Sequence, residues 1–151
     1  MRDFALGIIV FGLGLVVVFH LYWAAGGRLG ADLVIPRRPA AMGGESLFHP
    51  SPLGTLVVAF FLIGVAALAA LVQSGSGITL SWNWARALLA ACGAVFVLRA
   101  IGEFRYVGFF KRVTDSRFAY WDTRLFSPFI LLIGLACLAV AVQAEPGAAH
   151  R

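Results

Sequence analysis

The sequence has few charged residues for its length. Aspartate, glutamate, lysine and arginine make up 13% of its 151 residues, whereas 61% are hydrophobic. Soluble domains are about 25% charged and roughly 45 to 50% apolar. The composition therefore excludes a water-soluble globular domain and indicates an integral membrane protein.

Cysteine is also scarce, and the spacing of its two copies excludes a redox motif or a zinc site. Cys92 and Cys137 lie in separate apolar runs without a CxxC pattern, so we expect small packing residues. His20 and His49 have no nearby cysteine or fixed ligand spacing, and we predict no metal site. No HExxH run, phosphate loop or pair of catalytic carboxylates is visible, so the sequence identifies no catalytic residue and no cofactor.

Long hydrophobic runs predict four transmembrane helices. A helix needs about 20 mostly apolar residues to cross a hydrocarbon core of roughly 30 Å. Four stretches qualify, at about 4–25, 52–72, 84–101 and 126–142. Each must be helical, because backbone amides that face lipid have no water to bond. We predict an all-α polytopic membrane protein, a four-transmembrane-helix bundle that forms a single domain over residues 1–151.

Basic residues are distributed unequally between the two ends of the predicted bundle. The end formed by the first and third loops contains nine of the twelve: Arg28, Arg37, Arg38, Arg99, Arg105, Lys111, Arg112, Arg117 and Arg124. Because positively charged loops tend to stay in the cytoplasm, we predict an inner-membrane protein with loops one and three cytoplasmic and both termini outside. The net charge of +5 then suits membrane lipids as partners, and we expect no binding of nucleic acid.

Polar and aromatic side chains gather at this same predicted cytoplasmic end. We predict a ligand-binding site there, formed by His20, Tyr22, Trp23, Arg99, Glu103, Arg105, Lys111 and Asp122. Arginine offers a phosphate several planar donors, and aromatic rings can pack on an apolar tail. An interfacial network of salt bridges is the alternative interpretation of the same charged residues.

Two positions in this set suggest particular interactions. Arg99 and Glu103 are four residues apart, so on a continuing helix they would share a face and pair. His20 lies inside the end of the first span, where an imidazole needs a hydrogen-bond partner or a water-filled recess. A proton carrier, a metal ligand and a hydrogen-bonded packing group are all compatible with that position.

Three segments resemble a family of small bacterial four-span membrane proteins of unknown function. They are HLYWAAGG at residues 20–27, LRAIGEFRYVGFFKRV at 98–113 and FAYWDTRLFSP at 118–128. The resemblance covers nearly the whole chain and implies the four-span fold, but it implies no activity. It matches the family's motif positions at His20, Tyr22, Trp23, Gly26, Gly27, Arg99, Gly102, Phe104, Arg105, Gly108, Lys111 and Asp122. Glu103 and Phe126 depart from the pattern, which has Asp and Tyr there.

Three functions are compatible with these features. The first is binding or moving an amphipathic, lipid-like anion in a polar pocket at the cytoplasmic face. The second is an accessory role, in which the outer apolar faces pack on a larger membrane complex or on a second copy of the chain. The third is an enzyme for a membrane-soluble substrate, with His20 as acid or base and Glu103 or Asp122 positioning it.

Overall fold

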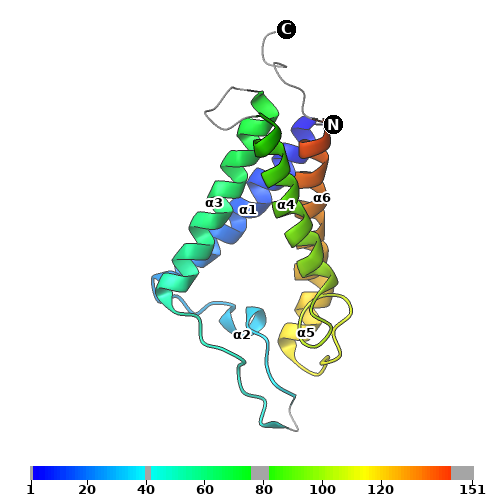
Figure 1. The fold of residues 1–151 in the computed structure, drawn as a ribbon. Helices are drawn as coiled ribbons and strands as arrows, with labels where there is room; N and C mark the ends of the chain where they lie inside the picture. The colour runs from blue at the N-terminus through cyan, green and yellow to red at the C-terminus, as the bar shows by residue number, and fades with distance from the viewer. Residues whose placement is uncertain (1, 40–41, 76–81, 144–151) are drawn as a thin grey trace.

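The computed structural model describes residues 2–39, 42–75 and 82–143, and the regular elements among them are helices (Figure 1). The four long helices are α1 (Arg2–Ala24), α3 (Pro52–Ser74), α4 (Trp82–Ile101) and α6 (Ser127–Gln143). Shorter segments are α2 (Ala31–Val34), α5 (Arg117–Trp121) and a π-helical turn, η2 (Asp122–Phe126), which joins α5 to α6. The predicted all-α fold is confirmed.

Four helical segments are long and apolar enough to cross a membrane. They are Asp3–Ala24, Pro52–Ser74, Asn83–Ile101 and Arg117–Gln143. Each overlaps one of the spans predicted from the sequence. The chain is therefore a multi-pass membrane protein.

Local sequence explains where α3 begins and ends. The Ser51 Oγ accepts a hydrogen bond from the Gly54 N–H at 3.0 Å, and Pro52 occupies the first helical position, where its missing N–H costs nothing. Gly75 follows the last turn with φ of 65°, a left-handed conformation that suits glycine. These signals fix the length of the second span.

The long helices pack as two pairs, α1 with α3 and α4 with α6, and α1 also contacts α6. The α4–α6 contact is close because two glycines face each other across it. A Cβ on Gly93 would lie 2.9 Å from the Gly134 carbonyl oxygen, and a Cβ on Gly134 would lie 2.9 Å from the Gly93 oxygen. Small residues allow this approach, and close packing is a principal source of helix association in lipid.

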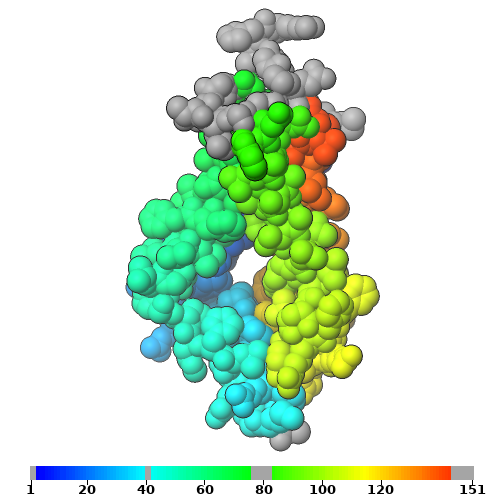
Figure 2. Space-filling model, in the orientation of Figure 1, coloured from blue at the N-terminus to red at the C-terminus, as the bar shows by residue number. Residues whose placement is uncertain are grey.

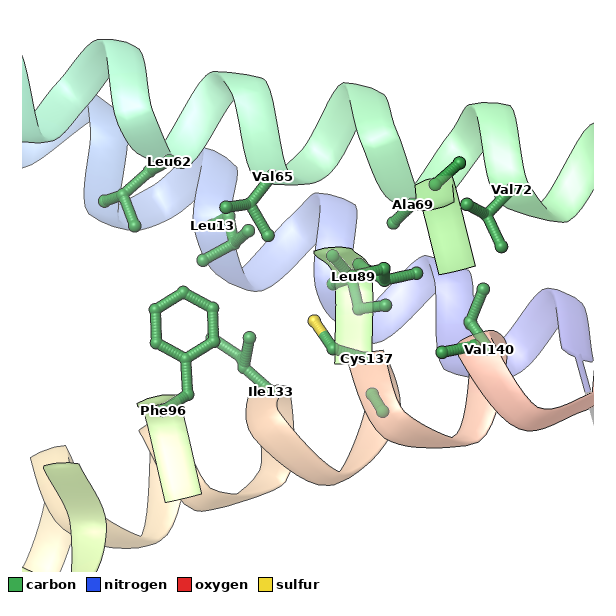
Figure 3. Packing of buried hydrophobic residues seen from close by; sticks show 14 of the residues in the cluster. Leu13, Leu62, Val65, Ala69, Val72, Leu89, Phe96, Ile133, Cys137 and Val140 are labelled. Atoms are coloured by element: carbon green, nitrogen blue, oxygen red, sulfur yellow. The ribbon is translucent and has the colours of Figure 1, made fainter. Parts of the chain in front are cut away.

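The core shared by all four helices lies toward the ends that carry the termini. Figure 3 shows most of its buried members, which are Ile9, Leu13, Val17, Leu62, Val65, Ala69, Val72, Ala85, Leu89, Phe96, Ile133, Ala136, Cys137, Val140 and Ala141. Among the described residues, no buried member of this core follows Val17 on α1 or Phe96 on α4, and none precedes Leu62 on α3. The loop-side halves of the two pairs therefore share no core.

The two pairs diverge where this core ends. Figure 1 shows α1 and α3 separating from α4 and α6 toward the end that carries α2 and α5. The space-filling view shows an opening between them at that end (Figure 2). We call this feature the interpair opening.

Candidate functional site

Loop three, residues 102–116, folds back onto the end of α4. The helix ends at Ile101 because Gly102 takes φ of 97° and the chain reverses. The N–H groups of Phe109 and Phe110 then donate to the carbonyls of Ala100 and Ile101, at 2.9 and 3.4 Å. These bonds satisfy carbonyls that a helix end would otherwise leave without partners.

Gly108 places the middle of loop three against this helix end. It has φ of 90° and lies so close to Gly102 that a Cβ on either glycine would overlap the other's backbone. The contact brings the Gly108 N–H to Asp122, whose Oδ2 accepts it at 2.8 Å. Loop three is therefore fixed to both α4 and η2.

Asp122 is fully buried and forms the centre of a charged cluster. Its Oδ1 accepts a hydrogen bond from Arg99 Nη2 at 2.9 Å, and its Oδ2 accepts one from Lys111 Nζ at 3.0 Å. We call Arg99, Lys111 and Asp122 the Asp122 cluster. A buried carboxylate needs such pairing, because desolvation of an unpaired charge costs several kcal/mol.

Lys111 is held entirely within the protein. Besides Asp122, its Nζ donates to the Gly108 carbonyl at 2.7 Å and to Thr123 Oγ1 at 2.6 Å. An ammonium group has three hydrogens, and all three are therefore used. Lys111 has no donor left for a ligand.

Arg99 has a donor left. Among the described residues only Asp122 bonds to it, through Nη2, whereas its Nη1 is buried and has no hydrogen-bond partner there. The side chain as a whole is 36% exposed, although its Nη1 atom is itself buried. An unpaired buried donor is unfavourable, and an acceptor placed beside it would be stabilising.

The predicted pairing of Arg99 with Glu103 is wrong. It assumed that the helix continues, but α4 ends at Ile101 and the chain turns away. The Glu103 carboxylate instead accepts hydrogen bonds from the N–H groups of Tyr106 and Val107, the latter at 3.2 Å. Glu103 therefore stabilises the turn in which Phe104 takes φ of 66°.

His20 lies near the end of α1 and is partly buried. Its Nδ1 is 2.8 Å from the Val16 carbonyl oxygen, and its ring meets the Trp23 ring edge-on at 5.4 Å between centroids. Because a carbonyl oxygen only accepts, we assign the hydrogen to Nδ1. Nε2 is then free, within the described chain, to bond a ligand.

Tyr22 and Trp23 fasten the start of loop one, residues 25–51, to α1. Trp23 Nε1 donates to the Leu29 carbonyl at 2.9 Å, and the Leu29 N–H donates to Tyr22 Oη at 3.3 Å. Gly27 packs against the Tyr22 ring so closely that a Cβ there would overlap it. In this structure both aromatic residues therefore hold the turn after α1.

His20 and Arg99 occupy matching positions on the two helix pairs. His20 comes three residues after Val17, and Arg99 comes three residues after Phe96, the last buried core residues of α1 and α4. Residues three apart share a helix face, and Figure 3 shows Phe96 pointing toward the side where Leu13 and Leu62 lie. Both residues therefore lie just beyond the last buried core residues of their helices, where the interpair opening begins.

Arg105, the remaining predicted residue, lies elsewhere. Its guanidinium is 5.1 Å from the centroid of the Tyr106 ring. It borders a pocket of about 420 Å³ that is formed within loop three and lined by Glu103, Phe104, Arg105, Arg112 and Val113. The eight predicted residues thus fall into the group at the end of α1, the Asp122 cluster and this loop-three pocket.

Most of the chain matches a known protein family. Residues 13–137 match DUF3995, a family described as proteins of unknown function. The chain belongs to this family. The match includes every candidate residue from His20 to Asp122, and the predicted resemblance to a four-span family without known function is confirmed. No curated protein and no solved structure matches the chain.

Membership in DUF3995 assigns no chemical role to these residues, because the family is described as of unknown function. Within residues 2–39, 42–75 and 82–143, no three His, Cys, Asp or Glu side chains gather as they would around a metal ion. Sequence reasoning missed Thr123 and the Gly108 backbone, both partners in the Asp122 cluster. A threonine beside an aspartate gives no signal of that role, because the contact depends on how loop three folds back.

Proposed function

We propose that this DUF3995 protein binds an anionic amphiphile of the membrane, a phosphate-bearing lipid, in the interpair opening. The observation that carries the proposal is the unpartnered Nη1 of Arg99 at the level where the four-helix core ends. A phosphate oxygen beside it would accept a charge-assisted hydrogen bond. The apolar tail would lie between the loop-side halves of the two helix pairs.

The charges of the Asp122 cluster favour an anion. Lys111 and Arg99 carry two positive charges against the single negative charge of Asp122. Since Lys111 uses all its donors internally, the excess charge is presented by Arg99. Asp122 holds the guanidinium through Nη2 and so keeps Nη1 in a fixed position, which lowers the entropic cost of binding.

His20 would contact the ligand from the opposite helix pair. With Nδ1 bonded to Val16, a neutral ring offers Nε2 as an acceptor to a lipid hydroxyl, and a protonated ring offers it as a donor to phosphate. A headgroup that carries both a phosphate and hydroxyls suits the two sides. We also propose that loops one and three face the cytoplasm of a bacterial inner membrane, following their excess of arginine and lysine.

The geometry favours binding over catalysis. The predicted catalytic role has Glu103 or Asp122 position His20, but Nδ1 of His20 bonds to the Val16 carbonyl, and both carboxylates bond to other groups. An accessory role would use the exposed apolar surface of α3, which includes Leu53, Val57, Phe60 and Phe61. Lipid satisfies such a surface equally well.

The test is the lipid that the purified protein retains. Arg99→Lys keeps the positive charge beside Asp122 but removes the second guanidinium nitrogen, and Arg124→Lys makes the same change at an exposed arginine that stacks on Tyr120 at 3.9 Å. Protein is extracted in a neutral detergent, and bound lipids are quantified by mass spectrometry.

We expect Arg99→Lys to retain about tenfold less anionic lipid, because it loses one charge-assisted hydrogen bond that contributes roughly 1.5 kcal/mol to binding. Arg124→Lys should retain as much as the unsubstituted protein. Equal retention by all three proteins would refute the proposal. Co-purification of a stoichiometric partner protein with all three, without lipid, would favour the accessory role.

A further inference from the structure

A second polar pocket lies where loop one meets α5. It has a volume of about 300 Å³ and is lined by Asp32, Arg37, Arg38, Gly44, Asp115, Ser116 and Arg117. Loop one connects α1 to α3, whereas α5 leads through η2 into α6. Figure 1 shows α2 of loop one and α5 facing each other across the end where the pairs diverge. The pocket is therefore formed by segments from both helix pairs.

Positive charge is in excess in this pocket. Three arginines line it with two aspartates, and Arg117 Nη1 forms an ion pair with Asp32 Oδ2 at 2.7 Å. The side chains of Arg37 and Arg38 have no ion pair or hydrogen bond within the described chain. Two adjacent guanidinium groups are thus available to an anion.

The backbone of loop one holds these two arginines in place. Arg37 forms an antiparallel bridge with Ser46, and the Arg38 N–H donates to the Glu45 carbonyl at 2.9 Å. The Leu47 N–H donates to the Pro36 carbonyl at 3.0 Å, which extends the same ladder. A backbone fixed before binding lowers the entropic cost of capturing a ligand.

We propose that this pocket binds a phosphate monoester, recognised by Arg37 and Arg38 with Arg117 at its edge. Guanidinium groups match phosphate oxygens with paired N–H donors, and a monoester carries close to two negative charges at neutral pH. The pocket volume accommodates a phosphate group with a substituent and is larger than a chloride ion requires. This site is separate from Arg99 and does not depend on the lipid proposal.

A bound monoester would join the two helix pairs at the loop end. It would contact loop one through Arg37 and Arg38 and α5 through Arg117, beside the ion pair that already links these segments. The ligand would therefore stabilise the contact between α2 and α5. Its source is either a free phosphate ester or a lipid with a terminal phosphate.

The experiment measures binding of inorganic phosphate to the full chain in neutral detergent by calorimetry. In the second arm the chain is placed in nanodiscs that contain phosphatidic acid, which has a monoester headgroup, or phosphatidylglycerol, which has a diester. The binding of the two lipids to the chain is then compared. The test variant is R37Q/R38Q, and the control is R28Q, an exposed loop-one arginine that does not line the pocket. Circular dichroism checks that each variant is helical, and R38Q replaces the double variant if that one does not fold.

We expect saturable phosphate binding that R37Q/R38Q weakens at least tenfold and that R28Q and R99K preserve. Binding in the calorimetric arm identifies a free phosphate ester as the ligand class, and a preference for phosphatidic acid alone identifies a lipid headgroup. Absence of Arg37- and Arg38-dependent binding in both arms overturns the proposal. Because inorganic phosphate has no apolar tail, a failure here is distinct from a failure of lipid retention at Arg99.

Discussion

At the residue scale, Asp122 determines how three segments meet. Asp122 belongs to η2. Its carboxylate accepts hydrogen bonds from a side chain of α4, a side chain of loop three and a backbone N–H of loop three. Removing the charge of a buried carboxylate leaves the positive charges of its partners unpaired. Asp122 is therefore the residue whose loss should disturb the loop end most.

Asp122→Ala should lower the free energy of unfolding by about 3 to 5 kcal/mol, because it leaves buried Lys111 unpaired. Adding Lys111→Met removes that unpaired charge, so the double variant should be more stable than Asp122→Ala alone. Denaturant unfolding in detergent, followed by tryptophan fluorescence, measures the free energies of unfolding of Asp122→Ala, Lys111→Met and the double variant. A double variant whose loss equals the sum of the two single losses would show that the pair does not interact.

Gly108 gives a second prediction at this scale. Gly108→Ala should destabilise the protein by roughly 1 to 3 kcal/mol more than Gly26→Ala, because a Cβ at position 108 would overlap the Gly102 backbone. Gly26 has nearly the same φ, 93° against 90°, but open space around it. Thermal unfolding of the two variants compares the overlap directly, and equal melting temperatures would be inconsistent with the packing described.

Single residues of the site were predictable, but their partners were not. The sequence identified three candidates, Arg99, Lys111 and Asp122. Ionisable groups near a membrane span are energetically costly, so their presence indicates a role. The pairing of Arg99 with Asp122 joins residues 23 apart in sequence and requires α4 to end at Ile101. Gly102 marks that end, although a glycine inside an apolar helix can also continue it, and helical spacing therefore suggested Glu103 instead.

At the scale of elements, the helices follow directly from composition. Runs of about 20 apolar residues in lipid must satisfy their backbone groups internally, so the ends of the four long helices were predictable to within a few residues. The segments α2, α5 and η2 were not predicted, because each is too short to show a period of its own. Their conformations depend on contacts such as the Asp32–Arg117 ion pair.

The contact between α4 and α6 makes a prediction for elements. Gly134→Val should separate the two helices and lower the melting temperature by several degrees, because its Cβ would lie 2.9 Å from the Gly93 oxygen. Gly64→Val, on α3, is the control, since a Cβ there meets nothing within 4 Å. If both substitutions lower the melting temperature equally, close packing at Gly93 and Gly134 does not stabilise the bundle.

At the scale of the whole molecule, the protein has two unlike halves. The terminal half contains the shared core, and Arg86 caps the end of α6 there by donating to the carbonyls of Ala141 and Val142 at 2.7 and 3.4 Å. The loop half contains the interpair opening (Figure 2), the Asp122 cluster and most of the basic residues. Sequence predicted the charge asymmetry, but hydropathy alone does not reveal that the helix pairs diverge.

The proposed function depends on what occupies the interpair opening. The most direct measurement is an experimental structure of the protein crystallised from a lipidic mesophase doped with phosphatidylglycerol. We predict headgroup density within hydrogen-bond distance of Arg99 Nη1, with an acyl chain between α3 and α4. A structure in which these helices close on each other below Phe96 and Leu62, leaving Arg99 without a ligand, would contradict the account.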